Sequence, residues 1–202
     1  MTLLPQENNL APLDGELYWL QTFIEPREAD RLFRVLLDTL AWAEEEIVIA
    51  GKAVRVPRLV CWYADADAVY RYSGVRHEPL PWSEELLAIR QTIEEQLGLS
   101  FNSVLANLYR DGNDSMGWHA DKEKELGRDP VIASLSLGEE RRFRIRHNKT
   151  RQILDFPLRH GDLLVMAGAL QQHWRHCVPK SRVPKRPRIN LTFRRIRSAA
   201  AP

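Results

Sequence analysis

The chain contains few cysteines, no long apolar run and almost no net charge. Cys61 and Cys177 are its only cysteines, which excludes a disulfide framework or a cysteine-rich zinc site, so we expect a reduced, cytoplasmic protein. No apolar run approaches the ~20 residues that a membrane-spanning helix needs, and residues 1–13 lack the basic flank and apolar core of a secretory signal. We therefore expect no membrane partner.

The formal net charge of +2 argues against a polycation, but the basic residues are unevenly distributed. Arg142, Arg144 and Arg146 alternate with apolar residues, so a strand at this point would carry a basic stripe on one face. Most charge runs are solvated surface, whereas a regular stripe also suits the binding of phosphate groups. The stripe alone leaves both interpretations open.

Local patterns predict two helices before Gly98 and many short strands after it. Pro26 begins a run of spaced apolar residues through Leu40, and Ser83 is a suitable N-cap for a second helix that ends at Gly98. A hairpin is predicted over residues 46–60. Later strands are predicted at 102–110, 131–137, 142–147, 152–156, 162–167 and 188–196.

This order of elements favours an α+β fold, with N-terminal helices and a double-stranded β-helix (jelly-roll) core. A chain of 202 residues is long enough for one well-buried domain and marginal for two. We therefore predict a single domain over residues 1–202, with a loosely ordered arm over 1–15 and the jelly-roll core over 98–197. We expect it to act as a monomer.

Histidine and aspartate residues near the middle of the chain have the chemistry of an iron site. His119 and Asp121 are two positions apart, so in extended backbone their side chains project to the same side. Either His173 or His176 could supply a second imidazole, and the spacing leaves both open. Two imidazoles and one carboxylate form the facial set used by non-haem Fe(II) oxygenases, which leaves further metal positions free.

A strand near the C-terminus combines an apolar face with a strongly polar one. On residues 188–194 the side chains of Arg188, Asn190, Thr192 and Arg194 share one face, and the predicted strand at 102–110 places Asn107 and Tyr109 on one face. A guanidinium group stays charged when buried and binds a carboxylate through two hydrogen bonds. Two arginines on an inward face therefore indicate an anionic ligand or acidic residues opposite them.

Four separate blocks now resemble one known family. Residues 107–112 (NLYRDG), 118–123 (WHADKE), 174–179 (WRHCVP) and 188–194 (RINLTFR) are similar to signature blocks of the AlkB family, whose members are Fe(II)- and 2-oxoglutarate-dependent dioxygenases. The similarity runs from about residue 56 to 196. It implies that Fe(II) is bound by His119, Asp121 and His176. It also implies that 2-oxoglutarate is bound by Arg188 and Arg194, helped by Asn107, Tyr109, Asn190 and Thr192.

The resemblance further implies the reaction and the substrate. Members of the family demethylate N-alkylated bases in nucleic acid, as in the repair of DNA alkylation damage, and release succinate, carbon dioxide and formaldehyde. Residues 47–74 correspond to the hairpin and the nucleotide-recognition lid of the family. The residues implied to contact the substrate are Arg58, Trp62, Tyr70, Tyr72 and Glu123.

One position departs from the pattern of the members that act on duplex DNA. Those members carry an aromatic wedge in the hairpin before the lid, which fills the gap left by a flipped base, whereas this chain has Ala50 there. A methyl group cannot replace a base in the stack. We therefore expect single-stranded DNA or RNA to be preferred over duplex.

Three other functions remain compatible with parts of this pattern. A 2-oxoglutarate oxygenase acting on a protein, lipid or small molecule would share the metal ligands and the arginines. A non-catalytic nucleic-acid-binding jelly roll would not need an intact set of them. A zinc hydrolase would leave the two arginines without a role.

Overall fold

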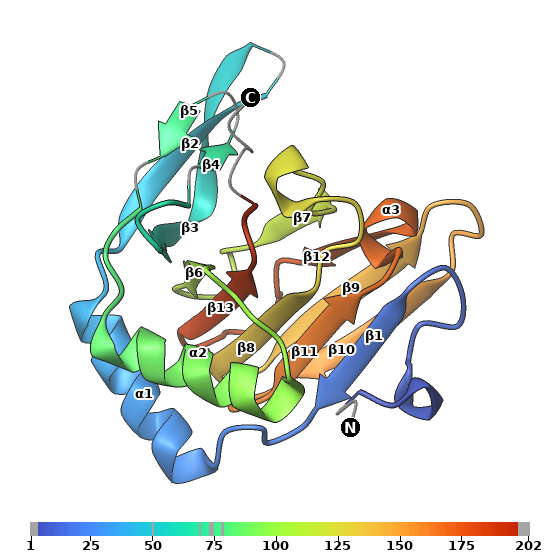
Figure 1. Ribbon diagram of the computed structural model, residues 1–202. Helices are drawn as coiled ribbons and strands as arrows, with labels where there is room; N and C mark the ends of the chain where they lie inside the picture. The colour runs from blue at the N-terminus through green and yellow to red at the C-terminus, as the bar shows by residue number, and fades with distance from the viewer. Residues whose placement is uncertain (1–3, 50, 69, 73–74, 78, 198–202) are drawn as a thin grey trace.

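The computed structural model describes residues 4–49, 51–68, 70–72, 75–77 and 79–197. Two antiparallel β-sheets form the body of the molecule, and two long helices lie against the larger sheet (Figure 1). The predicted α+β class and the jelly-roll core are confirmed.

The larger, seven-stranded sheet has the order β1-β11-β8-β13-β6-β3-β2, and the smaller, four-stranded sheet has the order β10-β9-β12-β7. The larger sheet contains β1 (Glu16–Leu20), β2 (Ala43–Ile49), β3 (Lys52–Ala64), β6 (Ser103–Tyr109), β8 (Ile132–Gly138), β11 (Leu163–Ala167) and β13 (Arg188–Arg194). The smaller sheet contains β7 (Met116–His119), β9 (Arg141–His147), β10 (Ile153–Leu158) and β12 (Trp174–Val178). A separate pair is formed by β4 (Tyr70–Tyr72) and β5 (Val75–His77).

The helices are α1 (Pro26–Thr39), α2 (Glu84–Leu97) and the short α3 (Leu170–His173), with 3₁₀ turns at Gln6–Asn8 and Lys124–Leu126. Both predicted long helices are confirmed together with their end signals. Pro26 is the first residue of α1, and the Ser83 hydroxyl accepts a hydrogen bond from the backbone N–H of Leu86 at 3.3 Å. Gly98 ends α2 with a φ of 64°, a left-handed conformation that suits glycine.

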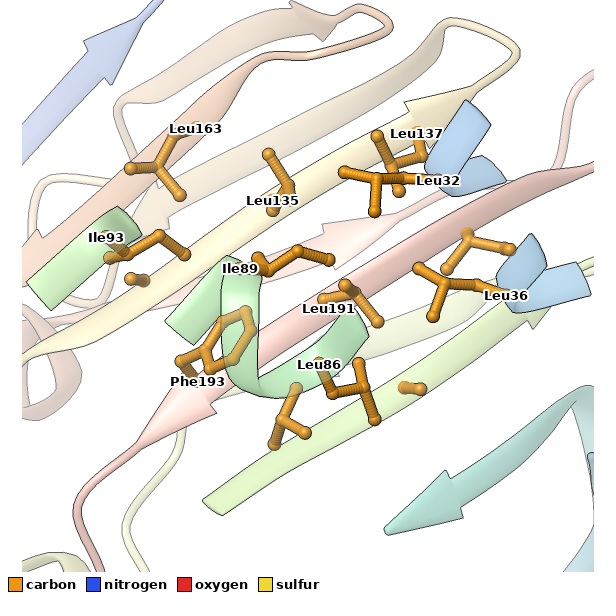
Figure 2. Close-up of a cluster of buried hydrophobic side chains, with 14 of the residues drawn as sticks. Leu32, Leu36, Leu86, Ile89, Ile93, Leu135, Leu137, Leu163, Leu191 and Phe193 are labelled. Carbon is orange, nitrogen blue, oxygen red and sulfur yellow. The ribbon is translucent and has the colours of Figure 1, made fainter. Parts of the chain in front are cut away.

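The apolar sides of α1 and α2 pack on the outer face of the larger sheet (Figure 2). Leu191 and Phe193 of β13 are fully buried in this cluster. Because side chains alternate along a strand, the polar residues of β13 must point the other way, into the space between the two sheets. The helix-covered core therefore turns the polar face of β13 inward. The cluster also contains Leu32, Leu36, Leu86, Ile89, Ile93, Leu135, Leu137 and Leu163.

All six strands predicted after Gly98 are present, and so is the predicted hairpin, as β2 and β3. No strand was predicted for the separate pair β4 and β5, and within the two sheets three strands have no predicted counterpart: β1, β7 and β12. Each of these three strands is short and pairs with a strand distant in sequence: β1 with β11, β7 with β12, and β12 also with β9. Local pattern could not reveal them, because their pairing is tertiary.

The N-terminal arm is attached to the body by hydrogen bonds that its polar, proline-containing composition did not indicate. The Asn9 side chain accepts hydrogen bonds from the backbone N–H groups of Ala11 and Leu17, each at 2.9 Å. The indole of Trp174 donates to the carbonyl of Leu13 at 3.0 Å. These contacts connect the arm to β1 and to the start of β12.

Both cysteines are buried and unpaired. Among the described helices, none has the length and apolar character needed to cross a bilayer.

Candidate metal centre and adjoining pockets

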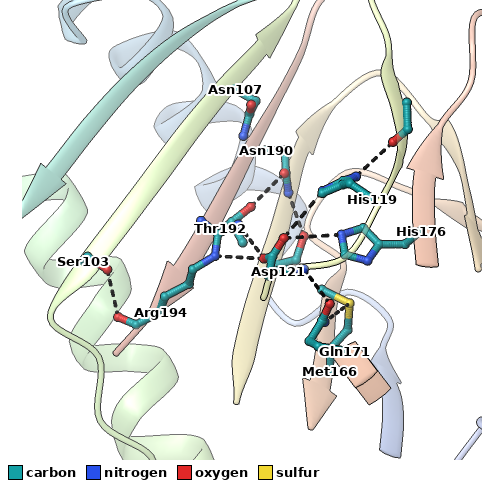
Figure 3. A network of polar contacts seen from close by, with 12 residues as sticks. Ser103, Asn107, His119, Asp121, Met166, Gln171, His176, Asn190, Thr192 and Arg194 are labelled. Atoms are coloured by element: carbon teal, nitrogen blue, oxygen red, sulfur yellow. Dashed lines mark hydrogen bonds and ion pairs between the residues drawn. The ribbon is translucent and has the colours of Figure 1, made fainter. Parts of the chain in front are cut away.

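Pairing between β7 and β12 brings two histidines together. His119, the last residue of β7, lies directly opposite His176 of β12, and their ring centroids are 4.1 Å apart. Asp121 follows two residues later, with its Oδ1 3.6 Å from His119 Nε2 and 3.9 Å from His176 Nε2 (Figure 3). The strand register therefore brings His176, and not His173, beside the H-x-D residues.

Both imidazoles can present a lone pair to a metal. His119 Nδ1 lies 2.9 Å from the carbonyl oxygen of Gly117, which can only accept, so Nδ1 carries the hydrogen and Nε2 is left as an acceptor. Burial, with a further contribution from the neighbouring His119, lowers the pKa of His176 to about 3, so its ring is neutral at neutral pH. Neutral imidazole is the form of histidine that binds metals.

The carboxylate of Asp121 divides its two oxygens between different partners. Burial by itself would raise the pKa of Asp121, but the positive charge of Arg194, with contributions from His176 and His119, outweighs burial and holds the pKa well below its usual range. Arg194 donates to Oδ2 from Nε at 2.9 Å and from Nη2 at 2.6 Å. Oδ1 faces the two imidazoles. Arg194 thus orients one oxygen and leaves the other available to a metal.

Gln171 holds the backbone of Asp121 in place, a role that the sequence did not suggest. Its Oε1 accepts a hydrogen bond from the Asp121 N–H at 2.9 Å, and its Nε2 lies 3.4 Å from the sulfur of Met166 (Figure 3). Gln171 is 2% exposed. The adjacent Gln172 is chemically identical in sequence, and only the orientation of α3 distinguishes the two.

Replacing Gln171 by leucine is expected to weaken metal binding by about 10- to 100-fold, as loss of an outer hydrogen-bond partner generally does. The reason is that the Asp121 N–H would lose its buried acceptor and the ligand loop could shift. Titration with Mn(II) or with Fe(II) under anaerobic conditions measures the effect. Gln172→Leu is the matched control, and equal affinities of the two variants would contradict this role for Gln171.

The described residues contain a second aspartate–histidine–histidine group, which consists of Asp14, His147 and His173. Its hydrogen bonds differ from those of the group formed by His119, Asp121 and His176. The backbone N–H of Thr150 donates to His147 Nδ1 at 3.1 Å, so the hydrogen of the neutral ring is on Nε2, which points at Asp14 Oδ2 at 3.2 Å. A protonated nitrogen cannot bind a metal, and this contact instead connects the N-terminal arm to β9.

His119, Asp121 and His176 form the metal-ligand group. The six side chains predicted to bind 2-oxoglutarate all line one cavity, the inner cavity, which lies beside this group and between the two sheets. The strand register explains this, because Arg188 pairs with Tyr109 and Asn190 pairs with Asn107 across β13 and β6. Thr192 donates to the Asn190 side chain at 3.0 Å, and Asn190 donates to Ser134 at 2.7 Å. Neighbouring strands therefore hold the polar side chains of the cavity in a fixed arrangement.

Arg188 is a buried cation whose hydrogen-bonding capacity is only partly used. It is 1% exposed; its Nη2 donates to Ser136 at 2.8 Å, while Nε and Nη1 have no hydrogen-bond partner among the described residues. No acidic side chain in the described part of the chain pairs with it. Burial lowers its pKa to about 10, so it remains charged at neutral pH. An anionic group in the cavity would compensate this charge.

A second cavity, of about 180 Å³, lies on the outer side of the metal-ligand group and contains three of the predicted substrate residues, Arg58, Trp62 and Glu123. Both cavities are lined by His119, Asp121 and Arg194 together with Leu105 and Met116. The metal-ligand group therefore lies where the two cavities meet. Arg58 connects them as well, since its Nε donates to Asn107 at 2.7 Å.

The remaining predictions for the lid are described only in part. Tyr70 and Tyr72 lie on β4, but their side chains are outside the described part of the structure. Ala50, the position of the missing wedge, also lies outside the described residues. Glu45 lines the outer cavity without having been predicted, because a run of three glutamates in sequence indicates only an exposed strand.

Comparison with known proteins identifies the family. Residues 16–194 match the 2OG-Fe(II) oxygenase superfamily. The mouse protein named DNA oxidative demethylase ALKBH2 is 38% identical over 180 residues, which cover 84% of this chain and 75% of the relative. This chain belongs to the AlkB family. Cattle alpha-ketoglutarate-dependent dioxygenase alkB homolog 3 is 41% identical over 184 residues, covering 86% of this chain and 64% of the relative.

The chain thus spans less than two thirds of the length of the cattle AlkB relative. A solved structure of OsALKBH1 has the same fold, with a TM-score of 0.62 at 17% identity, and the match covers 89% of this chain and 97% of that one. The cofactors of the 2OG-Fe(II) oxygenases are Fe(II) and 2-oxoglutarate, and the residues of this chain fit both. The metal-ligand group offers two imidazoles and a carboxylate oxygen, and Arg188 offers unpaired donors to a carboxylate.

Proposed function

We propose that this AlkB-family chain oxidatively demethylates N-alkylated bases in nucleic acid, using Fe(II), 2-oxoglutarate and dioxygen. The observation that supports this most strongly is the meeting of two cavities at the metal-ligand group. The inner cavity suits a small dicarboxylate, and the outer cavity leads to the same ligands from the other side. A base that entered the outer cavity would place its methyl group next to the metal.

In the inner cavity, Arg188 would hold a carboxylate of 2-oxoglutarate through its unpaired nitrogens, and the ring of Tyr109 lies 5.3 Å from its guanidinium carbon. Arg194, at the other end of β13, keeps Asp121 oriented. Leu105 and Met116 line both cavities and limit the entry of water. When bound, the iron and 2-oxoglutarate supply the oxidising chemistry that releases the methyl group as formaldehyde, with succinate and carbon dioxide as the other products.

The outer cavity suits one flipped base. Its volume of about 180 Å³, below the ~300–1,000 Å³ of pockets for drug-sized ligands, suits a single base. Trp62 offers an aromatic surface for stacking. Glu123 Oε2 is buried and has no hydrogen-bond partner among the described residues, so it is available to accept a hydrogen bond from an exocyclic amino group.

The basic stripe of β9 supports a track for the phosphate backbone. Arg146 lies over the ring of Trp118 at 4.5 Å, and Trp118 belongs to β7, the strand that borders the outer cavity. Arg175 of β12 is exposed and pairs in register with Arg146, which widens the basic surface. Among the described residues of this face, Arg144 alone forms an ion pair, with Asp155 at 2.6 Å. Binding to this surface would weaken with added salt.

We further propose that single-stranded nucleic acid is preferred and that the chain acts as a monomer. Ala50 offers no side chain large enough to fill the gap left by a flipped base.

The test compares demethylation of one methyladenine in single-stranded and duplex oligonucleotides of the same sequence. Formaldehyde and succinate should appear in equal amounts, and the single strand should react faster. Duplex activity equal to or above single-strand activity would overturn the strand preference. Succinate formed without demethylation of either substrate would favour an oxygenase that acts on a protein, lipid or small molecule.

A further inference from the structure

Glu45 of β2 lines the outer cavity at a point where the pairing of β2 with β3 is irregular. Glu44 pairs with Leu59 and Glu46 pairs with Arg55, so the single residue Glu45 faces residues 56–58 of β3. The irregularity includes Pro57, which has no N–H to donate to a sheet ladder. The extra residues of this bulge belong to β3, and the bulge lies beside the outer cavity, which Arg58 also lines.

The three consecutive glutamates of β2 consequently have different surroundings. Glu44 and Glu46 both lie beside Arg55, at 3.1 Å and 3.4 Å. Glu45 is half-buried, lines the outer cavity and makes no hydrogen bond or ion pair with another described residue. Alternation along the strand explains the difference, since neighbouring side chains point to opposite faces.

The outer cavity therefore has an excess of negative charge. Among the described residues, three carboxylates (Glu45, Asp121 and Glu123) and two arginines (Arg58 and Arg194) line it, and Arg194 is paired with Asp121. The carboxylates of Glu45 and Glu123 have no cationic partner among the described residues. A ligand with a positive charge would be attracted to this cavity, and a neutral ligand would not gain that attraction.

Methylated bases differ in charge. Methylation at N1 of adenine or N3 of cytosine modifies a nitrogen that carries no hydrogen, so the base becomes a cation at neutral pH. Methylation at N1 of guanine or N3 of thymine replaces a hydrogen, and the base stays neutral. Charge in the cavity can therefore separate lesions of similar size.

We infer that Glu45 is a specificity-determining residue whose carboxylate, with that of Glu123, selects cationic methylated bases over neutral ones. This inference rests on the proposed demethylase function and assigns one part of its substrate choice to a residue on β2. Glu45 acts by contact with the base, from the side of the cavity formed by the hairpin.

The test measures kcat/KM for single-stranded oligonucleotides that carry 1-methyladenine or 1-methylguanine, with wild-type protein and with Glu45→Gln. The ratio of the two kcat/KM values should fall about tenfold in the variant, the size of one charge-assisted interaction. Glu46→Gln removes the same charge one position away, beside Arg55, and should leave the ratio within about twofold. Glu45→Asp keeps the charge and should retain most of the preference.

Binding of the same oligonucleotides, followed by fluorescence anisotropy, gives a readout independent of turnover. The affinity for the cationic lesion should fall in Glu45→Gln, with unchanged melting temperature. Equal losses for cationic and neutral lesions, or equal effects of Glu45→Gln and Glu46→Gln, would overturn the role of Glu45. If wild-type protein demethylates neither oligonucleotide, the proposed function itself fails.

Discussion

Replacing Asp121 by alanine is expected to weaken metal binding by more than ~100-fold, beyond the effect of losing an outer hydrogen-bond partner, and to abolish turnover. Asp121 supplies the only carboxylate that lies beside both His119 and His176 in the described metal-ligand group. Its loss also leaves Arg194, the donor to Oδ2, without this partner next to two imidazoles. The positive charge of Arg194, no longer offset by Asp121, would then repel the metal.

Metal stoichiometry and succinate production measure this effect, and the second group of the same residue types provides matched controls. Asp14→Ala should leave metal binding intact, because Asp14 accepts a hydrogen bond from a His147 nitrogen that carries a hydrogen. In the same way, His176→Ala should abolish metal binding and His173→Ala should not. Oligonucleotide binding should persist in Asp121→Ala. Equal loss of metal in His173→Ala and His176→Ala would contradict the ligand assignment.

Replacing Arg188 by methionine is expected to weaken 2-oxoglutarate binding by about 100- to 1,000-fold, the usual effect of removing one partner of a buried ion pair. The same change should stabilise the ligand-free protein, because a buried cation without an acidic partner is replaced by an apolar side chain of similar length. Each kcal/mol gained should raise Tm by about 2–4 °C for a chain of this size. Arg188 therefore favours 2-oxoglutarate binding but lowers the stability of the ligand-free protein.

Arg141 is the matched control, since it is also buried and its guanidinium carbon also lies 5.3 Å from the ring of Tyr109. Arg141 donates to the carbonyl oxygens of Asp111, Asp114 and Pro179 at 2.7–2.9 Å. Arg141→Met should therefore lower stability by about 3 kcal/mol. Thermal unfolding with and without 2-oxoglutarate distinguishes the two variants. If Arg188→Met lost as much stability as Arg141→Met and still bound 2-oxoglutarate, the assignment would be wrong.

Much of the fold could be predicted because its signals are local. Pro26, Ser83 and Gly98 mark helix ends through the conformations they favour, and strand alternation assigns the two faces of β13 without any knowledge of its neighbours. The strands β7 and β12 gave no comparable signal. Both are short, and pairing across 57 positions of sequence from His119 to His176 defines them.

The site residues can likewise be divided into those that local sequence indicates and those that only tertiary pairing brings together. The sequence alone determined the types of residue available: an H-x-D pair, two candidate histidines, and arginines on one face of a strand. Only the tertiary structure decided between His176 and His173, because the choice depends on which strand pairs with β7. It also separated the tasks of the two arginines, since Arg194 is paired with Asp121 whereas Arg188 keeps two unpaired nitrogens.

Gln171 and Glu45 could not have been found from sequence for the same physical reason. Each has a chemically identical neighbour, Gln172 or Glu46, and differs from it only in the direction of its side chain. For Gln171 that direction is set by the placement of α3. For Glu45, alternation along β2 gives the direction, and the pairing of β2 with β3 places that face beside the outer cavity. Local propensity determines which face of a strand or helix a residue occupies, whereas the packing of distant segments determines what that face meets.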